Sequence, residues 1–506
     1  MIKPLVIFII CLFSTITDCY GKKWVVGSNQ TYKLPSQINN LVGNGDTIYI
    51  DGGIYSNDAT KWARKNLKFI GRGTGNNRTR FQYTGDIPNG KGIFVFETPG
   101  TSDNAYIENI VFDGAQVSNG NGGNGAGIRF QAVNLTVQNC LFLNCQNGIL
   151  EGNANVTTSN VIIKDSEFRN NGYQLQNDPT YSGYEHNIYI GSSTDTLIVQ
   201  NCYFHDPRGQ ANSLKTRAQR SFILYNLIDE SAGYGSWELN IAQGGLNVII
   251  GNIIIQGPSG ANHGIIGYDA VTNFLEDFYF INNTVINKFQ GKVNFINIAP
   301  ASGIKNFKIY NNIFASVAGA TNTLFSGNVP IVLDTLKNIV ATNYSTFGFA
   351  NPSGNDYSLK PTALLAINKG AKAGITNTSY SLIPVSMYHS FNTAQMPRAI
   401  SGGEIDIGAY EYGGLMNSFL QRKDDKKWTL YPNPSSGKFT LECFDSANSI
   451  IKLEFYNLVG KLLIKDEFIP EQNKVVFSTS NLPNGIYLLK VQSKDKSDEI
   501  KVIITK

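Results

Sequence analysis

Residues able to carry acid–base chemistry recur in three short apolar strands between positions 185 and 245. These strands read HNIYIG over residues 186–191, SLKTR over residues 213–217 and ELNI over residues 238–241. They supply a lysine, an arginine, a tyrosine, a histidine and a glutamate, residue types that donate protons, accept protons or bind anions in enzyme sites. If the three strands lie side by side, the segment predicts a site for an acidic substrate.

Strand alternation predicts which of these side chains face solvent. Successive side chains point to opposite faces, so Ile188 and Leu214 in the core place Tyr189 and Lys215 outside. Ile188 and Leu214 are 26 residues apart, which corresponds to one coil of a repeating structure with neighbouring strands about 4.8 Å apart. By the same parity His186 faces inward. The predicted outward patch consists of Asn187, Tyr189, Lys215, Arg217, Glu238 and Asn240.

This patch contains what β-elimination from a uronic acid requires: a group that neutralises the carboxylate, a base, and a proton donor to the leaving oxygen. Lys215 is the candidate base, provided that its pKa falls from about 10.4 towards 7–8. The like charge of Arg217 acts in that direction, and Glu238 acts against it.

The remaining roles go to neighbouring residues. Arg217 and Asn240 are predicted to bind the substrate carboxylate, with or without a bound Ca²⁺ ion, while Tyr189 or His186 donates the proton. The other predicted substrate contacts are Glu238, Asn187 and Tyr268, the last in a turn together with Asp269.

A loose repeat positions these strands. Short alternating strands are followed by an asparagine and then by Gly/Asn-rich turns; the asparagines are Asn201, Asn226, Asn252, Asn283, Asn312 and Asn338. A drifting period in the twenties without helical patterning predicts a solenoid of stacked β-coils. Asparagine suits a repeated turn because it tolerates left-handed backbone and can hydrogen-bond along the stack.

The ends of the repeat carry a family resemblance. GDTIYIDGGIY at residues 45–55 and GGEIDIGAYEY at residues 402–412 resemble the opening and closing segments of secreted right-handed parallel β-helix proteins of the pectate-lyase-like superfamily. The resemblance covers residues 23–412. It implies an all-β chain in which residues 22–412 form a right-handed, single-stranded parallel β-helix.

A shorter resemblance concerns activity. LKTRA at residues 214–218, followed by Asn226, is similar to the Lys-Ser-x-x-Asn stretch of the alginate lyase and chondroitinase B family. That similarity implies that Lys215 is the base and that calcium binds the substrate carboxylate. One coil later the family has Arg-His-Gly, whereas this chain has Glu238-Leu239-Asn240. This departure leaves the acid, the calcium ion and the exact substrate open.

Residues 1–21 have the basic and apolar regions of a secretory signal peptide. Residues 413–427 are expected to be a linker, and residues 428–506 a small β-sandwich. YPNPSSG at residues 431–437, LPNGIYLLKV at 482–491 and KVIITK at 501–506 resemble the type IX secretion sorting domain of Bacteroidetes. That resemblance implies recognition by the type IX machinery and a secreted or cell-surface location. The alternative is an ordinary carbohydrate-binding sandwich.

The amino-acid composition limits the kinds of binding partner to be expected. The net charge is +4 and charged residues make up 16% of the chain, with no basic stripe of the nucleic-acid-binding kind. No apolar run after the leader is long enough to span a membrane. Cys140 and Cys202 lie in matching contexts and are expected to be stacked core thiols. A monomer is expected.

The favoured interpretation is an exported polysaccharide lyase acting on a uronate-containing glycan. Two alternatives stay open: a non-catalytic surface adhesin, and a glycoside hydrolase or epimerase on the same scaffold. A hydrolase needs two carboxyl groups about 5–9 Å apart, and Glu238 with Asp229 or Glu230 is the nearby supply.

Overall fold

The computed structural model describes most of the chain, which forms two compact units, residues 1–415 and 416–506. The described residues are 21–97, 103–152, 157–172, 185–262, 264–273, 275–299, 303–329, 333–389, 396–413, 428–433, 435–443, 450–457, 462–470, 474–479, 481–483, 485–493 and 496–504. Nearly all of the expected signal peptide and nearly all of the expected linker lie outside these ranges.

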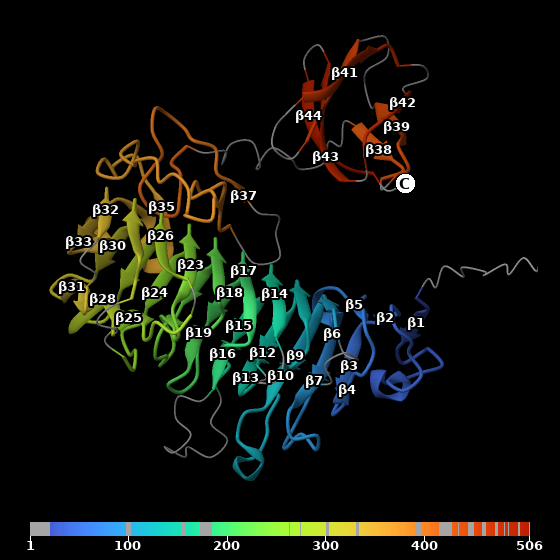
Figure 1. Cartoon of the computed structure of the whole chain (residues 1–506), viewed down its shortest axis with the longest axis horizontal. Coiled ribbons are helices and arrows are strands. Elements are labelled where there is room, and N and C mark those ends of the chain that lie inside the picture. Colours follow the sequence, from blue (N-terminus) through green and yellow to red (C-terminus); the bar gives the residue numbers. More distant parts are fainter. Residues whose placement is uncertain are drawn as a thin grey trace, which may run out of the picture. The chain divides into compact units, whose positions relative to one another are not determined.

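The first unit is a parallel β-helix, as predicted, in which each coil contributes a strand to each of three long sheets (Figure 1). Sheet A contains, in order, β1 (Lys23–Val26), β2 (Thr47–Ile50), β5 (Lys68–Gly71), β8 (Ala105–Glu108), β11 (Asn134–Gln138), β14 (Thr158–Lys164), β17 (Thr194–Gln200), β20 (Arg220–Leu224), β23 (Gly245–Ile250), β26 (Glu276–Ile281), β29 (Asn306–Tyr310) and β32 (Asp334–Leu336).

Sheet B contains β3 (Gly53–Ser56), β6 (Thr79–Gln82), β9 (Ile110–Asp113), β12 (Leu141–Leu143), β15 (Glu167–Arg169), β18 (Tyr203–His205), β21 (Leu227–Asp229), β24 (Ile253–Gln256), β27 (Thr284–Asn287), β30 (Ile313–Ser316) and β33 (Ile339–Ala341). Sheet C contains β4 (Thr60–Lys61), β7 (Gly92–Phe96), β10 (Ala126–Phe130), β13 (Asn147–Glu151), β16 (His186–Ile190), β19 (Asn212–Thr216), β22 (Leu239–Ile241), β25 (Gly264–Tyr268), β28 (Lys292–Ile298) and β31 (Thr321–Gly327).

Smaller elements complete this unit. They are the strand pairs β34 (Phe349–Asn351) with β35 (Asp356–Leu359) and β36 (Ser386–Met387) with β37 (Met396–Pro397), and the 3₁₀ turns η1 (Pro35–Ile38), η2 (Gly75–Asn77), η3 (Asn119–Asn121), η5 (Tyr344–Thr346) and η6 (Pro352–Gly354). Across the described part of the chain, no helix has the length and apolar character needed to cross a bilayer.

Stacked side chains fill the interior of the coils. Phe112, Phe142, Phe168 and Phe204 occupy one position in consecutive coils, with ring centres 5.1, 4.8 and 4.8 Å apart and nearly parallel planes. Each ring is fully buried. A coil cannot bury its own apolar face, so the repetition of one residue at one position gives each ring a partner above and below.

The predicted asparagine ladder is present between sheets A and B. The Nδ2 of Asn226 donates to Oδ1 of Asn252 at 2.9 Å, and Asn252 donates to Asn283 at 2.9 Å. Asn283 donates to Asn312 at 3.1 Å, and Asn312 donates to Asn338 at 2.8 Å. Each Oδ1 also accepts the backbone N–H of the preceding coil's asparagine.

The assignment of Asn201 to this ladder was wrong by one residue. Cys202 holds the ladder position, and its N–H donates to Asn226 Oδ1 at 2.9 Å. Asn201 sits just before it with φ of 53°, as do Asn282 at 52° and Asn311 at 59°. Two adjacent positions thus divide the roles that the sequence assigned to one: the first takes the left-handed turn, and the second bonds along the stack. Cys202 and Cys140 are buried free thiols, as expected.

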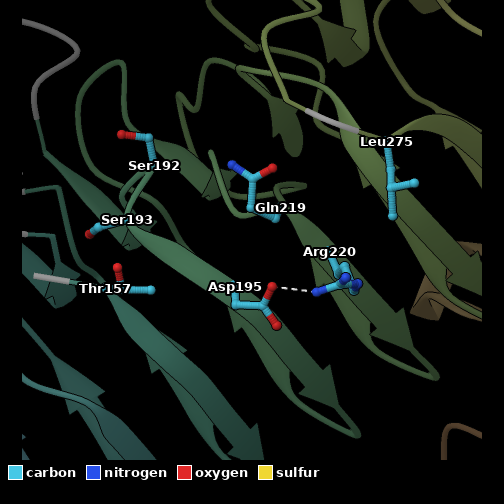
Figure 2. Close-up of a pocket in the computed structure, with 7 residues that line it drawn as sticks. All are labelled: Thr157, Ser192, Ser193, Asp195, Gln219, Arg220 and Leu275. Carbon is cyan, nitrogen blue, oxygen red and sulfur yellow. Dashed lines mark hydrogen bonds and ion pairs between the residues drawn. The ribbon is translucent and has the colours of Figure 1, made fainter.

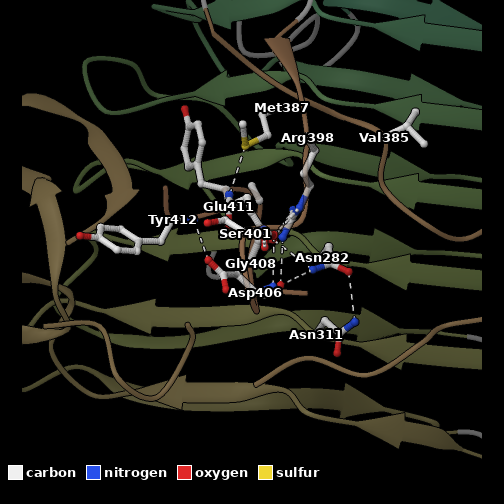
Figure 3. Close-up of polar contacts among 12 residues, drawn as sticks. Asn282, Asn311, Val385, Met387, Arg398, Ser401, Asp406, Gly408, Glu411 and Tyr412 are labelled. Atoms are coloured by element: carbon white, nitrogen blue, oxygen red, sulfur yellow. Dashed lines mark hydrogen bonds and ion pairs between the residues drawn. The ribbon is translucent and has the colours of Figure 1, made fainter. Parts of the chain in front are cut away.

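A buried ion pair fastens the closing segment that follows the last coil (Figure 3). Arg398 Nε lies 3.1 Å from Glu411 Oε2, and neither side chain is exposed. The guanidinium also donates to the carbonyls of Asp406 and Gly408, each at 2.9 Å. Asn282, in the turn between β26 and β27, donates to the Asp406 carbonyl at 2.8 Å. Buried charges are tolerated when they are paired and hydrogen-bonded in this way.

The second unit has the predicted sandwich architecture. One antiparallel sheet contains β38 (Trp428–Tyr431), β39 (Lys438–Cys443) and β42 (Lys474–Ser478). The other contains β41 (Leu462–Phe468), β40 (Ile451–Tyr456), β43 (Gly485–Ser493) and β44 (Lys496–Ile504). Phe439 and Phe477 from the first sheet and Phe455 from the second share one core, with ring centres 5.6 Å apart in each contact to Phe477.

Replacing Asn252 with alanine tests the asparagine ladder. The change removes the acceptor of the Asn226 backbone N–H and leaves the Val199 carbonyl as the remaining acceptor of the Asn226 amide, so the free energy of unfolding should fall by about 2–4 kcal/mol. Chemical denaturation monitored by circular dichroism measures the loss. Asn338→Ala, at the partly exposed end of the same ladder, should cost clearly less. Equal effects at both positions would contradict the account of the ladder.

Candidate functional site

Three side chains line up across the outer surface of sheet C, as the strand parity and the 26-residue offset predicted. Tyr189 of β16 pairs with Lys215 of β19, and Lys215 pairs with Asn240 of β22. The apolar neighbours Ile188, Leu214 and Leu239 form the matching buried row. We call the surface formed by Tyr189, Lys215, Arg217, Asn240 and Asp269 the Lys215 face.

Arg217 lies just after β19 and faces the same tyrosine. Its guanidinium carbon is 5.7 Å from the centre of the Tyr189 ring, and Lys215 Nζ is 5.8 Å from that centre. The backbone N–H of Arg217 donates to the Ile190 carbonyl at 2.9 Å, which holds the residue in register after the strand. Its Nε is buried and has no acceptor within the part of the chain that the structure describes. Two cations over one aromatic ring form a compact anion-binding surface.

The environment of Lys215 changes its acidity in the direction that a base requires. Burial of the half-exposed side chain lowers the pKa of Lys215, and the positive charge of Arg217 adds to the lowering. The Asp269 carboxylate acts in the opposite direction. The sequence had assigned that opposing role to Glu238.

His186 is buried, but its ring packs against the outward ring of Tyr189 and does not face the interior as its parity predicted. Its Nδ1 accepts the backbone N–H of Asn212 at 3.2 Å, which leaves the ring proton of the neutral form on Nε2. Burial lowers the pKa of His186 to about 3, and the charges of Lys215 and Arg217 contribute. The ring packs nearly parallel to Tyr189, with centres 5.7 Å apart. His186 therefore supports Tyr189 as a neutral group and is not a protonated acid.

Asp269 is a member of the site that the sequence reasoning had left in a turn. Asp269 follows Tyr268, which pairs with Ile241 of β22. Ile241 in turn pairs with Thr216 of β19, the residue just before Arg217. Asp269 therefore stands in the same row as Arg217, and the register of one further coil would have located it. Asn240 Nδ2 donates to Asp269 Oδ2 at 2.7 Å. Asn240 is almost fully buried, whereas Asp269 is exposed.

Trp237 adds an aromatic surface that the sequence reasoning also missed. A Cβ on Gly264 would lie 2.5 Å from the Trp237 ring, and one on Gly267 would lie 3.1 Å from it. The two glycines thus let the indole lie flat against β25, beside Asn240. The ring is partly exposed. A flat, partly exposed aromatic next to hydrogen-bonding groups can hold the apolar face of a sugar ring.

The prediction that Asn187 and Glu238 point outward was wrong, because both are completely buried. The strand pairing skips Asn187 and Ser213, where the chain bends into sheet C. One coil earlier Gly148 holds this position, and a Cβ there would lie 2.8 Å from the core ring of Phe168. Two consecutive residues, Asn187 and Ile188, therefore face the interior at this bend, and simple alternation of side chains fails there.

Glu238 instead forms a buried acid pair with Glu230. Ser213 Oγ donates to Glu230 Oε1 at 2.7 Å, while Glu230 Oε2 and both Glu238 oxygens have no hydrogen-bond partner among the described residues. Burial raises the pKa of Glu230 to about 8. Burial, followed by the charge of Glu230, raises the pKa of Glu238 well above its usual range. The carboxyl pair considered for a hydrolase is therefore inside the coil and away from the Lys215 face.

Tyr268 was predicted to contact substrate, but its side chain is also fully buried. Its hydroxyl donates to Glu276 Oε2 at 2.7 Å. Within the described ranges, no group of three or more His, Cys, Asp or Glu side chains is arranged to hold a metal ion.

The comparison with protein families concerns the second unit. Residues 429–505 match the secretion system C-terminal sorting domain. The chain is thus a type IX secretion substrate with a secreted or cell-surface location, and this domain is the part that interacts with the secretion machinery. No curated protein matches the chain.

The buried acid pair predicts an unusual pH dependence of stability. The folded pKa of Glu230 and Glu238 lies above the unfolded value of about 4.3, so their contribution is most favourable at acid pH and is lost as pH rises towards about 8. Glu238→Gln removes one of these titrating groups. The thermal midpoint of the variant should exceed that of the wild type by several degrees at pH 8 and by little at pH 4.5. A wild-type midpoint that rises between pH 5 and 8, with no gain from the substitution, would contradict this.

Proposed function

We propose that the β-helix is an exported polysaccharide lyase that cleaves a uronate-containing glycan by β-elimination. The observation that carries the proposal is Lys215: a half-buried lysine with a lowered pKa, stacked between Tyr189 and Asn240, with Arg217 in the same coil. A lysine in such surroundings can accept a proton near neutral pH.

Arg217 prepares the substrate for proton removal. A guanidinium binds a carboxylate through two parallel hydrogen bonds, and its charge stabilises the negative charge that develops on the uronate. Arg217 is held by its backbone N–H, and its buried Nε has no acceptor among the residues that the structure describes. The group can therefore bind an incoming carboxylate without breaking an existing ion pair.

Lys215 then takes the proton from the carbon beside the carboxylate, so that the C5–H bond breaks and a C4=C5 double bond forms. The C4–O bond breaks at the same time, and the Tyr189 hydroxyl supplies a proton to the leaving oxygen. The products are a new non-reducing end with an unsaturated uronide and the shortened glycan. Asp269 fixes the Asn240 amide beside Lys215, and Trp237 supports the neighbouring sugar.

The side chains around Lys215 do not fit a bound calcium ion. Ca²⁺ takes six to eight oxygen ligands, with carboxylates prominent among them. Asn240 and Asp269 offer side-chain oxygens here, but Asp269 Oδ2 already accepts from the Asn240 amide, and the cations Lys215 and Arg217 stand beside them. The proposed reaction therefore assigns carboxylate neutralisation to Arg217 alone.

A non-catalytic glycan-binding protein is the second candidate, and Trp237 is the observation that favours it. A partly exposed indole on a sheet, with an amide and two cations nearby, suffices for retention of an acidic polysaccharide without any cleavage. A hydrolase has less support, because Glu230 and Glu238 are buried.

Lys215→Ala tests the lyase directly. The purified full chain is incubated with alginate, polygalacturonate, chondroitin and ulvan, and absorbance near ~235 nm follows the unsaturated uronide produced by elimination. Loss of the base should slow product formation by about 10²–10⁴-fold. Lys292→Ala, at an exposed lysine of β28 in the same sheet, is the matched control and should match the wild type. Reducing ends without absorbance would establish a hydrolase, and retention without any product would establish a binding protein.

Removal of divalent cations tests the role assigned to Arg217. After dialysis against EDTA, activity on the preferred glycan should stay within about twofold of the untreated protein, since the carboxylate is neutralised by a side chain. Arg217→Ala should lose most activity whether or not calcium is added. Loss of activity with EDTA that is restored by Ca²⁺ would instead place a calcium ion in the reaction.

A further inference from the structure

A polar cavity lies around the corner from the Lys215 face, where the chain passes from sheet C into sheet A (Figure 2). Its volume is about 320 Å³, within the range of small-ligand sites. It is lined by Thr157, Ser192, Ser193, Asp195, Gln219 and Arg220, and Leu275 is its apolar member. Neither its position nor its residues belong to the reaction proposed above.

The cavity is tied to the Lys215 face by one short turn. Gln219 follows Arg217 by two residues, a span of no more than about 7 Å along the chain. Asn273 fixes that turn, since its Nδ2 donates to the Ala218 carbonyl at 3.0 Å and its Oδ1 accepts from Gln219 Nε2 at 2.8 Å. A polysaccharide with one sugar at Arg217 therefore carries neighbouring groups within reach of the cavity.

The charges of the cavity differ from those of the Lys215 face. Asp195 of β17 forms an ion pair with Arg220 of β20, and both side chains remain about two-fifths exposed (Figure 2). Thr196 Oγ1 donates to the other Asp195 oxygen at 2.9 Å, which holds the carboxylate in place. The pair has no net charge, so it offers neither the excess positive charge that a carboxylate needs nor the excess negative charge that a cation needs.

The hydrogen-bonding groups suit neutral hydroxyls. A carboxylate accepts and a guanidinium donates, so together they can bind two adjacent hydroxyl groups of one sugar. Ser193 Oγ is buried without a partner in the described protein, and a buried hydroxyl of this kind costs free energy until a ligand or water bonds to it. Serine, threonine and glutamine side chains complete a lining of mixed donors and acceptors.

We infer that this cavity binds a neutral sugar carried next to the uronate, so that the substrate is a glycan mixing uronic acid with neutral sugars. The inference rests on the proposed function, because it takes the uronate at Arg217 as its reference point. The substrate class is thereby narrowed from any polyuronate to a mixed glycan, and the Asp195–Arg220 pair becomes a specificity determinant.

Affinity electrophoresis of the full chain tests this without requiring turnover. The gels contain either polygalacturonate or alginate, which are linear polyuronates, or rhamnogalacturonan or glucuronoxylan, which combine uronate with neutral sugars. Wild-type protein should be retarded by at least one mixed glycan about tenfold more strongly than by either polyuronate. Ser192→Trp, which fills the cavity from an exposed position, and Arg220→Ala, which breaks the pair, should each reduce that retardation to the polyuronate level.

Asp334→Asn is the matched control, because Lys308 and Asp334 form a similar ion pair on sheet A away from the cavity. This variant should migrate as the wild type does, and the thermal midpoints of all variants establish that they fold. The inference is overturned if both cavity variants behave as the wild type in mixed-glycan gels, if they weaken binding to polyuronates equally, or if no mixed glycan retards the wild type. Arg217→Ala separates the two proposals. If this variant is retarded as strongly as the wild type in every uronate gel, the proposed function is overturned. The effect of Ser192→Trp then still decides whether the cavity binds a neutral sugar.

Discussion

Lateral hydrogen bonding between successive coils is the constraint on which the rest of this molecule depends. Neighbouring strands lie about 4.8 Å apart, so residues in the same position of consecutive coils become direct neighbours although 21 or more residues separate them. Tyr189, Lys215 and Asn240 meet in this way on the outside, as Phe142 and Phe168 do on the inside. A shift of one residue in pairing would exchange the two rows and remove the site.

Burial shifts the pKa of a lysine and the pKa of a glutamic acid in opposite directions. On the outer surface it lowers the pKa of Lys215, with help from Arg217, and so makes a better base. In the interior it raises the pKa values of Glu230 and Glu238, which favours their neutral forms. An environment that disfavours charge thus favours the neutral amine of Lys215 and the neutral acids of Glu230 and Glu238. The sign of the charge that a group carries when ionised decides the direction in which its pKa shifts.

The sequence was sufficient to predict the coils, the sandwich and the row of Tyr189, Lys215 and Asn240, because each follows from a simple period. Tyr189 and Lys215 were paired correctly by parity and one coil offset, and the asparagine ladder was located apart from Asn201. Parity failed at Asn187 and Glu238, since the bend into sheet C turns two successive residues inward. Trp237 depends on space left by two glycines and not on any period, so no pattern indicated it. Asp269 could have been located, had the register been extended by one coil beyond Ile241.

The sorting domain and the proposed active site lie in separate parts of the chain. The sorting domain accounts for residues 429–505, and the β-helix carries the Lys215 face and the neutral cavity beside it. The most direct measurement of the central claim is a crystal structure of the Lys215→Ala variant soaked with a uronate oligosaccharide of a glycan that the wild type cleaves. The expected result is a uronate carboxylate on the Arg217 guanidinium, with its C5–H directed at the vacated position of residue 215 and the leaving oxygen near Tyr189. An oligosaccharide bound elsewhere, with the Lys215 face empty, would contradict it.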